Sequence, residues 1–348
     1  MSEEIKAEGS RYAHLDLLRL IACFLVVFNH TQGCIRLYEY DSIDFTVLVR
    51  LFIAMIVKIN VPIFYMITGS LLLNRDRDYK DIFRRIAKMF AILLIFSIAA
   101  HLCYNKGNFY IPGFIRNFAS ATVDGAGPYW YLYAYLGILL ILPFLRSIAV
   151  RMRPNDVFYL IVVRFVIGAA IPMLFKIANS VVDSNMHLAL EFQPAIILVD
   201  CVFYPLIGYG LDRCLEGKEP SFFGRIPFAV MFAAADLLGI LALIIAGPEE
   251  AFDGFVFLMV ISVFMFVKKS VVKSRHRADK TISLLGSLTF GIYLLDPVIG
   301  PFFKQLFDFK GDHKQFWSSI AYCIFSMSVG GAITLLYKKV KTRILKTS

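Results

Sequence analysis

Two side chains in the first apolar segment could carry out acid–base chemistry on an anionic substrate. Arg19 and His30 lie eleven residues apart in the run LDLLRLIACFLVVFNH. On an α-helix, eleven residues make three turns and about 20° more, so both side chains leave one face, about 16 Å apart along the axis. An imidazole can take a proton from a hydroxyl, and a guanidinium can bind a phosphate through two hydrogen bonds. The pair therefore predicts an anionic ligand near Arg19 and a base at His30.

The composition shows what kind of structure must hold this helix. Of the 348 residues, 58% are apolar and only 18% are charged, against about 45–50% apolar residues in an average soluble domain. The mean hydropathy is +0.68. A polytopic membrane protein fits these values, whereas a disordered chain and a secreted disulfide scaffold are excluded. A nucleic-acid ligand is disfavoured despite the net charge of +10. The six cysteines form no CxxC pair, so we expect no metal site.

A helix that spans a membrane needs roughly 20 apolar residues. The sequence contains about ten such runs, so we expect an all-α transmembrane bundle without strands. The expected spans are 15–35, 45–73, 82–104, 128–149, 156–178, 194–212, 226–246, 252–267, 281–303 and 315–337.

The distribution of Lys and Arg predicts the orientation of these spans. With the N-terminus in the cytoplasm, the cytoplasmic segments hold 24 of the 36 basic residues and the opposite loops hold six. This asymmetry predicts that both termini are cytoplasmic. We expect a cytoplasmic segment over 1–14, a membrane domain over 15–337 and a basic cytoplasmic tail over 338–348. The basic segments would also contact anionic lipid headgroups of the bilayer.

Arg19 and His30 also have structural explanations. Arg19 could reach the membrane interface and pair with Asp16, three residues earlier on an adjacent stripe. His30 could be a hydrogen-bonded core histidine. Their common face favours a functional site, because charged groups inside spans are usually functional. Asp16 is thus a candidate substrate-binding residue as well as a partner for Arg19.

Three further charges lie within the expected spans. Arg164 falls in the middle of the fifth span, Asp200 in the sixth and Asp236 in the seventh. We expect Arg164 to form a structural ion pair with one of the two aspartates, and a substrate role is the alternative. Trp130 begins the fourth span among tyrosines, where an interfacial aromatic belt explains it and stacking on a sugar ring is the lesser alternative.

Five motifs in this order resemble the membrane-bound acyltransferase 3 family, whose members O-acylate cell-envelope glycans. The first is the eleven-residue step from Arg19 to His30. VPIFYMITGS is similar to an apolar run that ends in Ser-Gly, with Thr68 in place of the serine. FRRIAKM is similar to the family's Arg-x-x-Arg, with Arg85 matched and Lys88 in place of the second arginine.

The last two motifs lie at Trp130 and near the C-terminus. PYWYLY resembles the Trp-Tyr-Leu start of span four. FGIYLLDP, which contains Tyr293, resembles Tyr-x-Ile-Tyr-Leu-x-His, but Asp296 stands where many members have histidine. A carboxylate there could orient a histidine or bind a cation, and both alternatives stay open. The lysine at position 88 keeps a positive charge but loses the planar guanidinium fork. The resemblance covers about 11–340.

The resemblance implies acyl transfer, with acetyl as the default group, from cytoplasmic acyl-CoA to a hydroxyl of an envelope glycan or glycolipid outside a bacterial cytoplasmic membrane. Acyl-CoA would be a co-substrate, and no bound cofactor is expected. His30 would act as general base, in direct transfer or through an acyl-histidine. The CoA phosphates would be bound by Arg19, Arg84, Arg85 and Lys88. The candidate substrate-binding residues are Asp16, Asn29, Thr68, Trp130, Tyr293 and Asp296, of which Asn29 and Thr68, like Thr31, could donate to an oxyanion.

Two other classes of function remain open. A transporter or flippase for a lipid-linked sugar or polysaccharide would also need about ten spans and buried charges, although such proteins often have internal repeats. The sequence shows no convincing repeat. A membrane sensor that binds a small molecule is the third alternative. The combination of Arg19 and His30 favours the enzyme, because transport does not require a base opposite a phosphate site.

Overall fold

The computed structural model describes most of the chain. The described residues are 13–31, 43–182, 185–192, 194, 199–216, 224–245, 252–271, 276–307 and 312–347. Within them the secondary structure is helical and contains no strand. The expected all-α fold is therefore confirmed. Nearly all of the expected N-terminal segment 1–14 lies outside the described residues.

Nine helical stretches in the described ranges are long and apolar enough to cross a membrane. They are Ala13–His30, Phe45–Leu72, Tyr79–Tyr104, Gly127–Ala149, Pro154–Asn179, Arg225–Ile245, Gly254–Val271, Lys280–Phe303 and Gln315–Ile344.

The sixth expected span, 194–212, is shorter than the others. Its described helix consists of α11 (Asp200–Tyr209, 10 residues) and a π-helical turn, η4 (Gly210–Cys214, 5 residues). At about 1.5 Å per residue, this helix is about 22 Å long, less than a bilayer's hydrocarbon core of roughly 30 Å. Apolar composition predicted where this segment lies, but not how long its helix is.

The chain forms two compact units. The first unit comprises Met1–Leu18, Cys34–Asp76 and Ile141–His276, and the second comprises Arg19–Gly33, Arg77–Leu140 and Arg277–Ser348. Each unit is therefore built from three separate stretches of sequence.

In the first unit, α4 (Asn60–Leu72) packs closely against α11. A Cβ atom at Gly69 would collide with the backbone of Pro205, and one at Gly208 would collide with the backbone of Met66. The Ser70 hydroxyl donates to the Gly208 carbonyl at 3.0 Å. Small residues are what allow two helix backbones to approach this closely in a membrane protein.

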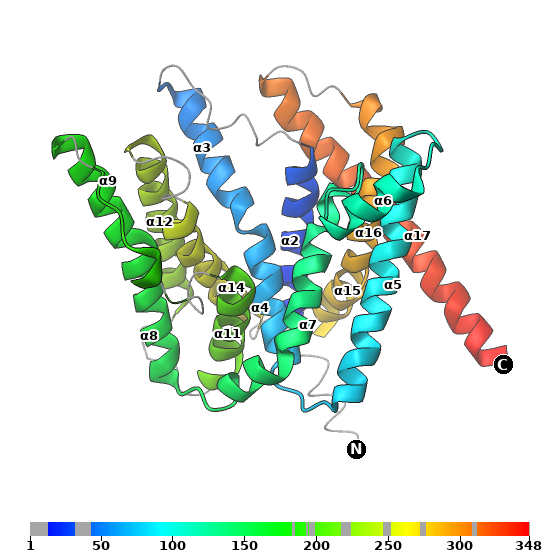
Figure 1. The fold of residues 1–348 in the computed structure, drawn as a ribbon, viewed down its shortest axis with the longest axis horizontal. Coiled ribbons are helices and arrows are strands. Elements are labelled where there is room, and N and C mark those ends of the chain that lie inside the picture. The colour runs from blue at the N-terminus through cyan, green and yellow to red at the C-terminus, as the bar shows by residue number, and fades with distance from the viewer. Residues whose placement is uncertain are drawn as a thin grey trace. The chain divides into compact units, whose positions relative to one another are not determined.

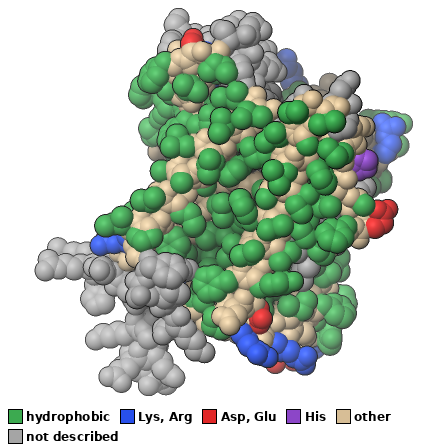
Figure 2. Space-filling view, turned by 90° about the vertical axis from the view of Figure 1, so that its left-hand side faces the viewer, with side chains coloured by type: hydrophobic (Ala, Val, Ile, Leu, Met, Phe, Trp, Pro, Cys, Tyr) green, Lys and Arg blue, Asp and Glu red, His purple; other side chains and the backbone are tan. Residues whose placement is uncertain are grey.

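Several of the remaining helices of the first unit expose broad apolar surfaces, whereas α14 (Phe257–Val271) is largely buried. The others are α3 (Phe45–Lys58), the end of α7 (Trp130–Ala149), α8 (Pro154–Phe165), η2 (Val166–Ala170), α9 (Ile171–Val182), η3 (Leu190–Phe192), α12 (Arg225–Ile245) and η5 (Phe252–Val256). Exposed apolar side chains on α8, α9 and α12 include Tyr159, Val162, Leu174, Val181, Ile226, Val230 and Leu237. Figure 2 views the molecule from the side of α8 and α9. It shows hydrophobic side chains covering the middle of this side, with charged groups towards its edges. A lipid-facing surface explains this pattern.

The second unit contains the rest of the helices (Figure 1). They are most of α2 (Ala13–His30), α5 (Tyr79–Tyr104), α6 (Ile111–Ala119), η1 (Gly127–Tyr129), the start of α7 (Trp130–Ala149), α15 (His276–Gly286), α16 (Thr289–Phe303), η6 (Lys304–Leu306) and α17 (Asp312–Thr347). Within this unit α16 packs against α17 and α5.

Two prolines interrupt the backbone hydrogen bonding of one helix of the second unit. α16 contains Pro297 and Pro301 in its interior; each lacks an N–H and so removes one helical hydrogen bond. The Tyr129 hydroxyl donates to the Leu294 carbonyl at 2.6 Å, one turn before Pro297. The carbonyl that Pro297 leaves without a helical N–H is that of Tyr293, one residue before Leu294. The bond from Tyr129 fixes η1 to α16.

Candidate active site

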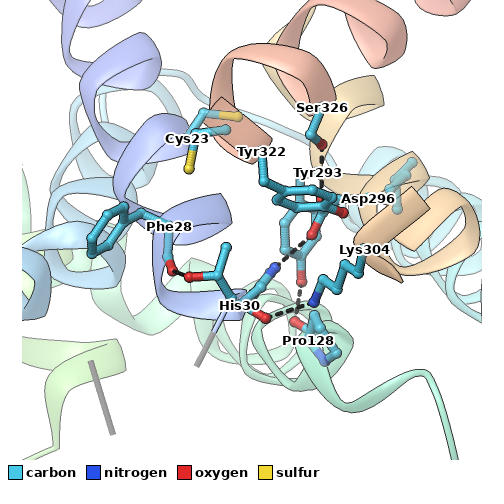
Figure 3. Close-up of polar contacts among 12 residues, drawn as sticks. Cys23, Phe28, His30, Pro128, Tyr293, Asp296, Lys304, Tyr322 and Ser326 are labelled. Atoms are coloured by element: carbon cyan, nitrogen blue, oxygen red, sulfur yellow. Dashed lines mark hydrogen bonds and ion pairs between the residues drawn. The ribbon is translucent and has the colours of Figure 1, made fainter. Parts of the chain in front are cut away.

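His30 and Asp296 form a hydrogen-bonded pair inside the second unit (Figure 3). His30 is the last residue of α2, and Asp296 lies in the middle of α16. Nδ1 of His30 lies 2.9 Å from Oδ2 of Asp296, and the two side chains are 13% and 1% exposed. An ionised carboxylate can only accept hydrogen bonds, so Nδ1 is the protonated nitrogen. The lone pair is therefore on Nε2, where the ring can accept a proton.

The carboxylate of Asp296 is itself held by α17. Its Oδ1 accepts hydrogen bonds from the Tyr322 hydroxyl at 2.9 Å and the Ser326 hydroxyl at 2.8 Å. With the bond from His30, both oxygens have donors and the carboxylate plane is fixed. The sequence left open whether Asp296 orients a histidine or binds a cation, and the structure shows it bonded to a histidine. Its three hydrogen bonds hold the imidazole ring in one position.

A lysine that the sequence analysis did not single out contacts the other side of His30. Lys304 follows α16 directly, and its Nζ donates to the backbone oxygen of His30 at 2.6 Å. The ammonium also lies 5.5 Å from the centroid of the Tyr322 ring. Burial lowers the pKa of Lys304, and attraction to Asp296 partly opposes this shift. The ammonium caps a carbonyl at the C-terminus of α2, which has no helical N–H partner.

The residues directly before and after His30 differ in their hydrogen bonding. Oγ1 of Thr31 lies 2.7 Å from both the Phe28 carbonyl oxygen and the Ser319 hydroxyl. The Thr31 hydroxyl is therefore engaged between α2 and α17. Asn29 is partly buried next to His30 in the chain, so it stays a candidate for contacting a substrate.

Aromatic side chains pack beside the pair. The Tyr293 hydroxyl donates to the Pro128 carbonyl at 2.6 Å, and its ring meets those of Tyr129 and Tyr131 edge to face at 6.0 and 6.4 Å. Trp130 lies edge to face with Tyr131 at 6.4 Å and is 48% exposed. Tyr293 thus holds the start of α7 in place, whereas Trp130 presents an aromatic surface outward.

Three arginines of the second unit act electrostatically on one phenol. The positive charges of Arg85, Arg77 and Arg19 all act on Tyr135. They come from α5, the turn before it and α2. Nη1 of Arg85 is buried and has no hydrogen-bond partner among the described residues. The group formed by Arg19, Arg77 and Arg85 is hereafter the arginine cluster, and it can attract an anion.

The other two expected phosphate ligands face elsewhere. Arg84 is 72% exposed and forms an ion pair with Asp81 at 3.3 Å, one turn earlier on α5. Lys88, one turn after Arg84, is also exposed. Adjacent helix residues point about 100° apart, so the face of α5 that presents Arg85 to the cluster turns Arg84 outward. Sequence analysis did not identify Arg77 as a member.

A family model described as an acyltransferase domain matches residues 12–337, nearly the whole chain. The chain belongs to the acyltransferase 3 family. No curated protein matches it, and no solved structure matches it. The resemblance inferred from the five motifs is therefore confirmed. The matched region contains His30, Asp296 and the arginine cluster.

Two of the expected site residues of this acyltransferase belong to the first unit. Asp16 lies on α2 and is buried. The hydroxyl of Thr68, on α4, donates to the Phe64 carbonyl at 2.8 Å. The Thr68 hydroxyl thus bonds back to its own helix, as serine and threonine often do inside apolar helices.

The expected ion pair of Arg164 also lies in the first unit of the acyltransferase. Nη2 of Arg164 lies 3.2 Å from Oδ1 of Asp200, and the guanidinium stands 5.3 Å from the centroid of the Phe203 ring. Asp200, rather than Asp236, is thus the partner, and the pair is confirmed. Among the described residues, no group of three or more His, Cys, Asp and Glu side chains could hold a metal ion.

Proposed function

We propose that this membrane acyltransferase moves an acyl group, acetyl by default, from cytoplasmic acyl-CoA to a hydroxyl of an envelope glycan or glycolipid at the outer face of the cell membrane. The observation that carries the proposal is the buried His30–Asp296 pair at one end of a helix whose other half carries Arg19 in a cluster of arginines. Membership of an acyltransferase family supports the reaction class.

The geometry of the pair supports general base catalysis. Asp296 holds the proton on Nδ1, so Nε2 can accept the proton of an acceptor hydroxyl as its oxygen attacks the acyl carbon. The positive charge that forms on the ring is balanced by the carboxylate 2.9 Å away. In the Ser-His-Asp hydrolases an aspartate serves the histidine in the same two ways. This arrangement supports direct transfer, in which His30 carries only a proton.

The arginine cluster supports a phosphate-bearing donor. Guanidinium groups match phosphate oxygens with paired hydrogen bonds and keep their charge at all physiological pH values. Arg19 and His30 lie on one continuous helix, about 16 Å apart along its axis. A donor bound by its phosphates at the cluster would have to extend over this distance to bring its thioester to His30. A long, thin arm such as that of acyl-CoA is suited to this geometry.

The proposal is tested with purified full-length protein in lipid nanodiscs, given acetyl-CoA labelled in the acetyl group and candidate glycans. The expected result is protein-dependent release of free CoA together with labelled glycan, which disappears in His30→Ala and His30→Gln. Both variants must unfold at the same temperature as the wild-type protein, which shows that the loss of activity does not come from a loss of folding. Full activity of a folded His30→Ala variant would remove the assigned base. Glycan movement across a vesicle without acyl-CoA would support the transporter instead.

A further inference from the structure

The charged groups bonded to His30 within the described residues have opposite signs. Asp296 accepts from the ring at 2.9 Å, and the Lys304 ammonium donates to the backbone oxygen of the same residue at 2.6 Å. Figure 3 shows both side chains reaching His30 from α16 and its continuation. An ammonium has three N–H groups and the bond to His30 uses one of them. The site therefore has a positive charge with further donor capacity next to the proposed base.

The proposed reaction creates two charges that need partners. When the acceptor hydroxyl attacks the thioester, its O–H bond breaks and the proton moves to Nε2 of His30. The new C–O bond forms while the carbonyl electron pair moves to the carbonyl oxygen, which becomes an oxyanion. The carbonyl is then restored as the C–S bond breaks, and the CoA thiolate takes the proton from the imidazolium. Asp296 balances the imidazolium, so a cation is needed for the oxyanion.

We propose, on the basis of the proposed function, that Lys304 is a further catalytic residue whose ammonium stabilises this oxyanion. The thioester carbon must come close to Nε2, since the attacking hydroxyl lies between them, and Lys304 is already bonded to the backbone of that histidine. The bond to the His30 carbonyl and the Tyr322 ring, whose centroid lies 5.5 Å from the ammonium, hold it in place. Donors fixed in advance and shielded from water contribute most to such electrostatic stabilisation.

A purely structural role makes different predictions. Lys304 could serve only as a cap for the C-terminal carbonyl of α2. A neutral amide can provide that cap, whereas stabilising an oxyanion requires charge. Lys304→Gln therefore keeps a donor and removes the charge, Lys304→Arg keeps both, and Lys304→Met removes both. Loss of a cap would appear mainly as lower thermal stability, and loss of oxyanion stabilisation as lower kcat with little change in KM.

The experiment measures kcat and KM for transfer from acetyl-CoA by full-length wild-type protein, the three Lys304 variants and Lys106→Met in nanodiscs. Lys106 is an exposed lysine of the same unit and serves as the control. We expect kcat to fall about 100-fold or more in Lys304→Gln and Lys304→Met, to be partly retained in Lys304→Arg and to be unchanged in Lys106→Met. A CoA analogue with a tetrahedral phosphonate in place of the thioester carbonyl should lose affinity for the Gln variant, whereas acetyl-CoA should not.

The outcomes separate this inference from the one on which it rests. Transfer that depends on His30 but persists in a folded Lys304→Gln variant would overturn the role of Lys304 alone. If Lys304→Met does not fold, the comparison of Gln with Arg still decides the matter, because equal kcat values in these two would show a cap. Wild-type protein that transfers no acyl group from acyl-CoA would overturn the proposed function and this inference together.

Discussion

Asp296 contacts the ring of His30 although 266 residues separate the two in the chain. The contact depends on where α2 ends and on the packing of α16 and α17, which place the carboxylate between the ring and the hydroxyls of Tyr322 and Ser326. Every oxygen of the carboxylate accepts a hydrogen bond. The imidazole therefore has one tautomer and one orientation before any substrate binds.

Asp296→Asn should abolish most activity while preserving the shape of the side chain. An amide can present its NH₂ group to Nδ1, which would then become the acceptor and move the proton to Nε2, where it blocks the base. In a Ser-His-Asp triad the same change lowers kcat about 10⁴-fold, and we expect a loss of about 100- to 10,000-fold here. Steady-state kinetics and a thermal unfolding curve test this prediction. A folded Asp296→Asn variant with near wild-type kcat would contradict it.

Arg85 and Arg84 provide a matched pair of substitutions. They are neighbours on α5 with the same charge, but Arg85 belongs to the arginine cluster and Arg84 is exposed. Loss of a charge-assisted hydrogen bond costs about 1.5–3 kcal/mol, so Arg85→Gln should raise the KM for acyl-CoA about 10- to 100-fold. Arg84→Gln should change it little. The measurement is KM at constant ionic strength, and equal effects of the two substitutions would count against a phosphate site at the cluster.

Local sequence was sufficient for the features that depend on one helix. The uninterrupted apolar run predicted α2, and the eleven-residue step placed Arg19 and His30 on it. The family motifs pointed to Asp296 as unusual. The charges within the spans predicted an ion pair of Arg164 with Asp200 or Asp236, and the structure shows Asp200 as the partner. These signals come from helical periodicity and from the cost of burying an unpaired charge.

Tertiary packing decided the rest. Tyr322 and Ser326 lie one turn apart on α17, and two polar residues in an apolar span are a weak signal. Lys304 matches no motif. Their roles follow only from the contact of α16 with α17 and α2. Arg84 and Arg85 look alike in the sequence, and only the packing of α5 decides that Arg85 is partly buried and Arg84 is exposed.

The ion pair of the first unit should be asymmetric in its effect on stability. The Arg164 side chain is 4% exposed and that of Asp200 is 48% exposed. Asp200→Asn removes the carboxylate that lies 3.2 Å from a buried cation, at a cost of about 3 kcal/mol, the low end for buried pairs. Arg164→Met leaves a carboxylate that water can still solvate, so it should cost less. Thermal unfolding in detergent compares the two variants. An Asp200→Asn variant that is more stable than Arg164→Met would contradict the prediction.

The activity should decline at alkaline pH because Lys304 loses its proton. Burial lowers the pKa of Lys304 below its ordinary value of 10.5, so the charge that would balance the oxyanion is lost before pH 10.5 is reached. The groups that face it are His30 on α2, Asp296 on α16, and Tyr322 and Cys323 on α17.

Two variants assign this alkaline limb of the pH–kcat profile. Arginine keeps its charge above pH 12, so Lys304→Arg should move the limb to higher pH. Tyr322→Phe should leave the limb in place, because it removes a phenol and keeps the ring beneath the ammonium. The profile is recorded at saturating acyl-CoA, after a preincubation at each pH to confirm that the protein stays folded. A limb that moves in Tyr322→Phe and not in Lys304→Arg would assign the titration to the phenol and leave Lys304 without a part in it.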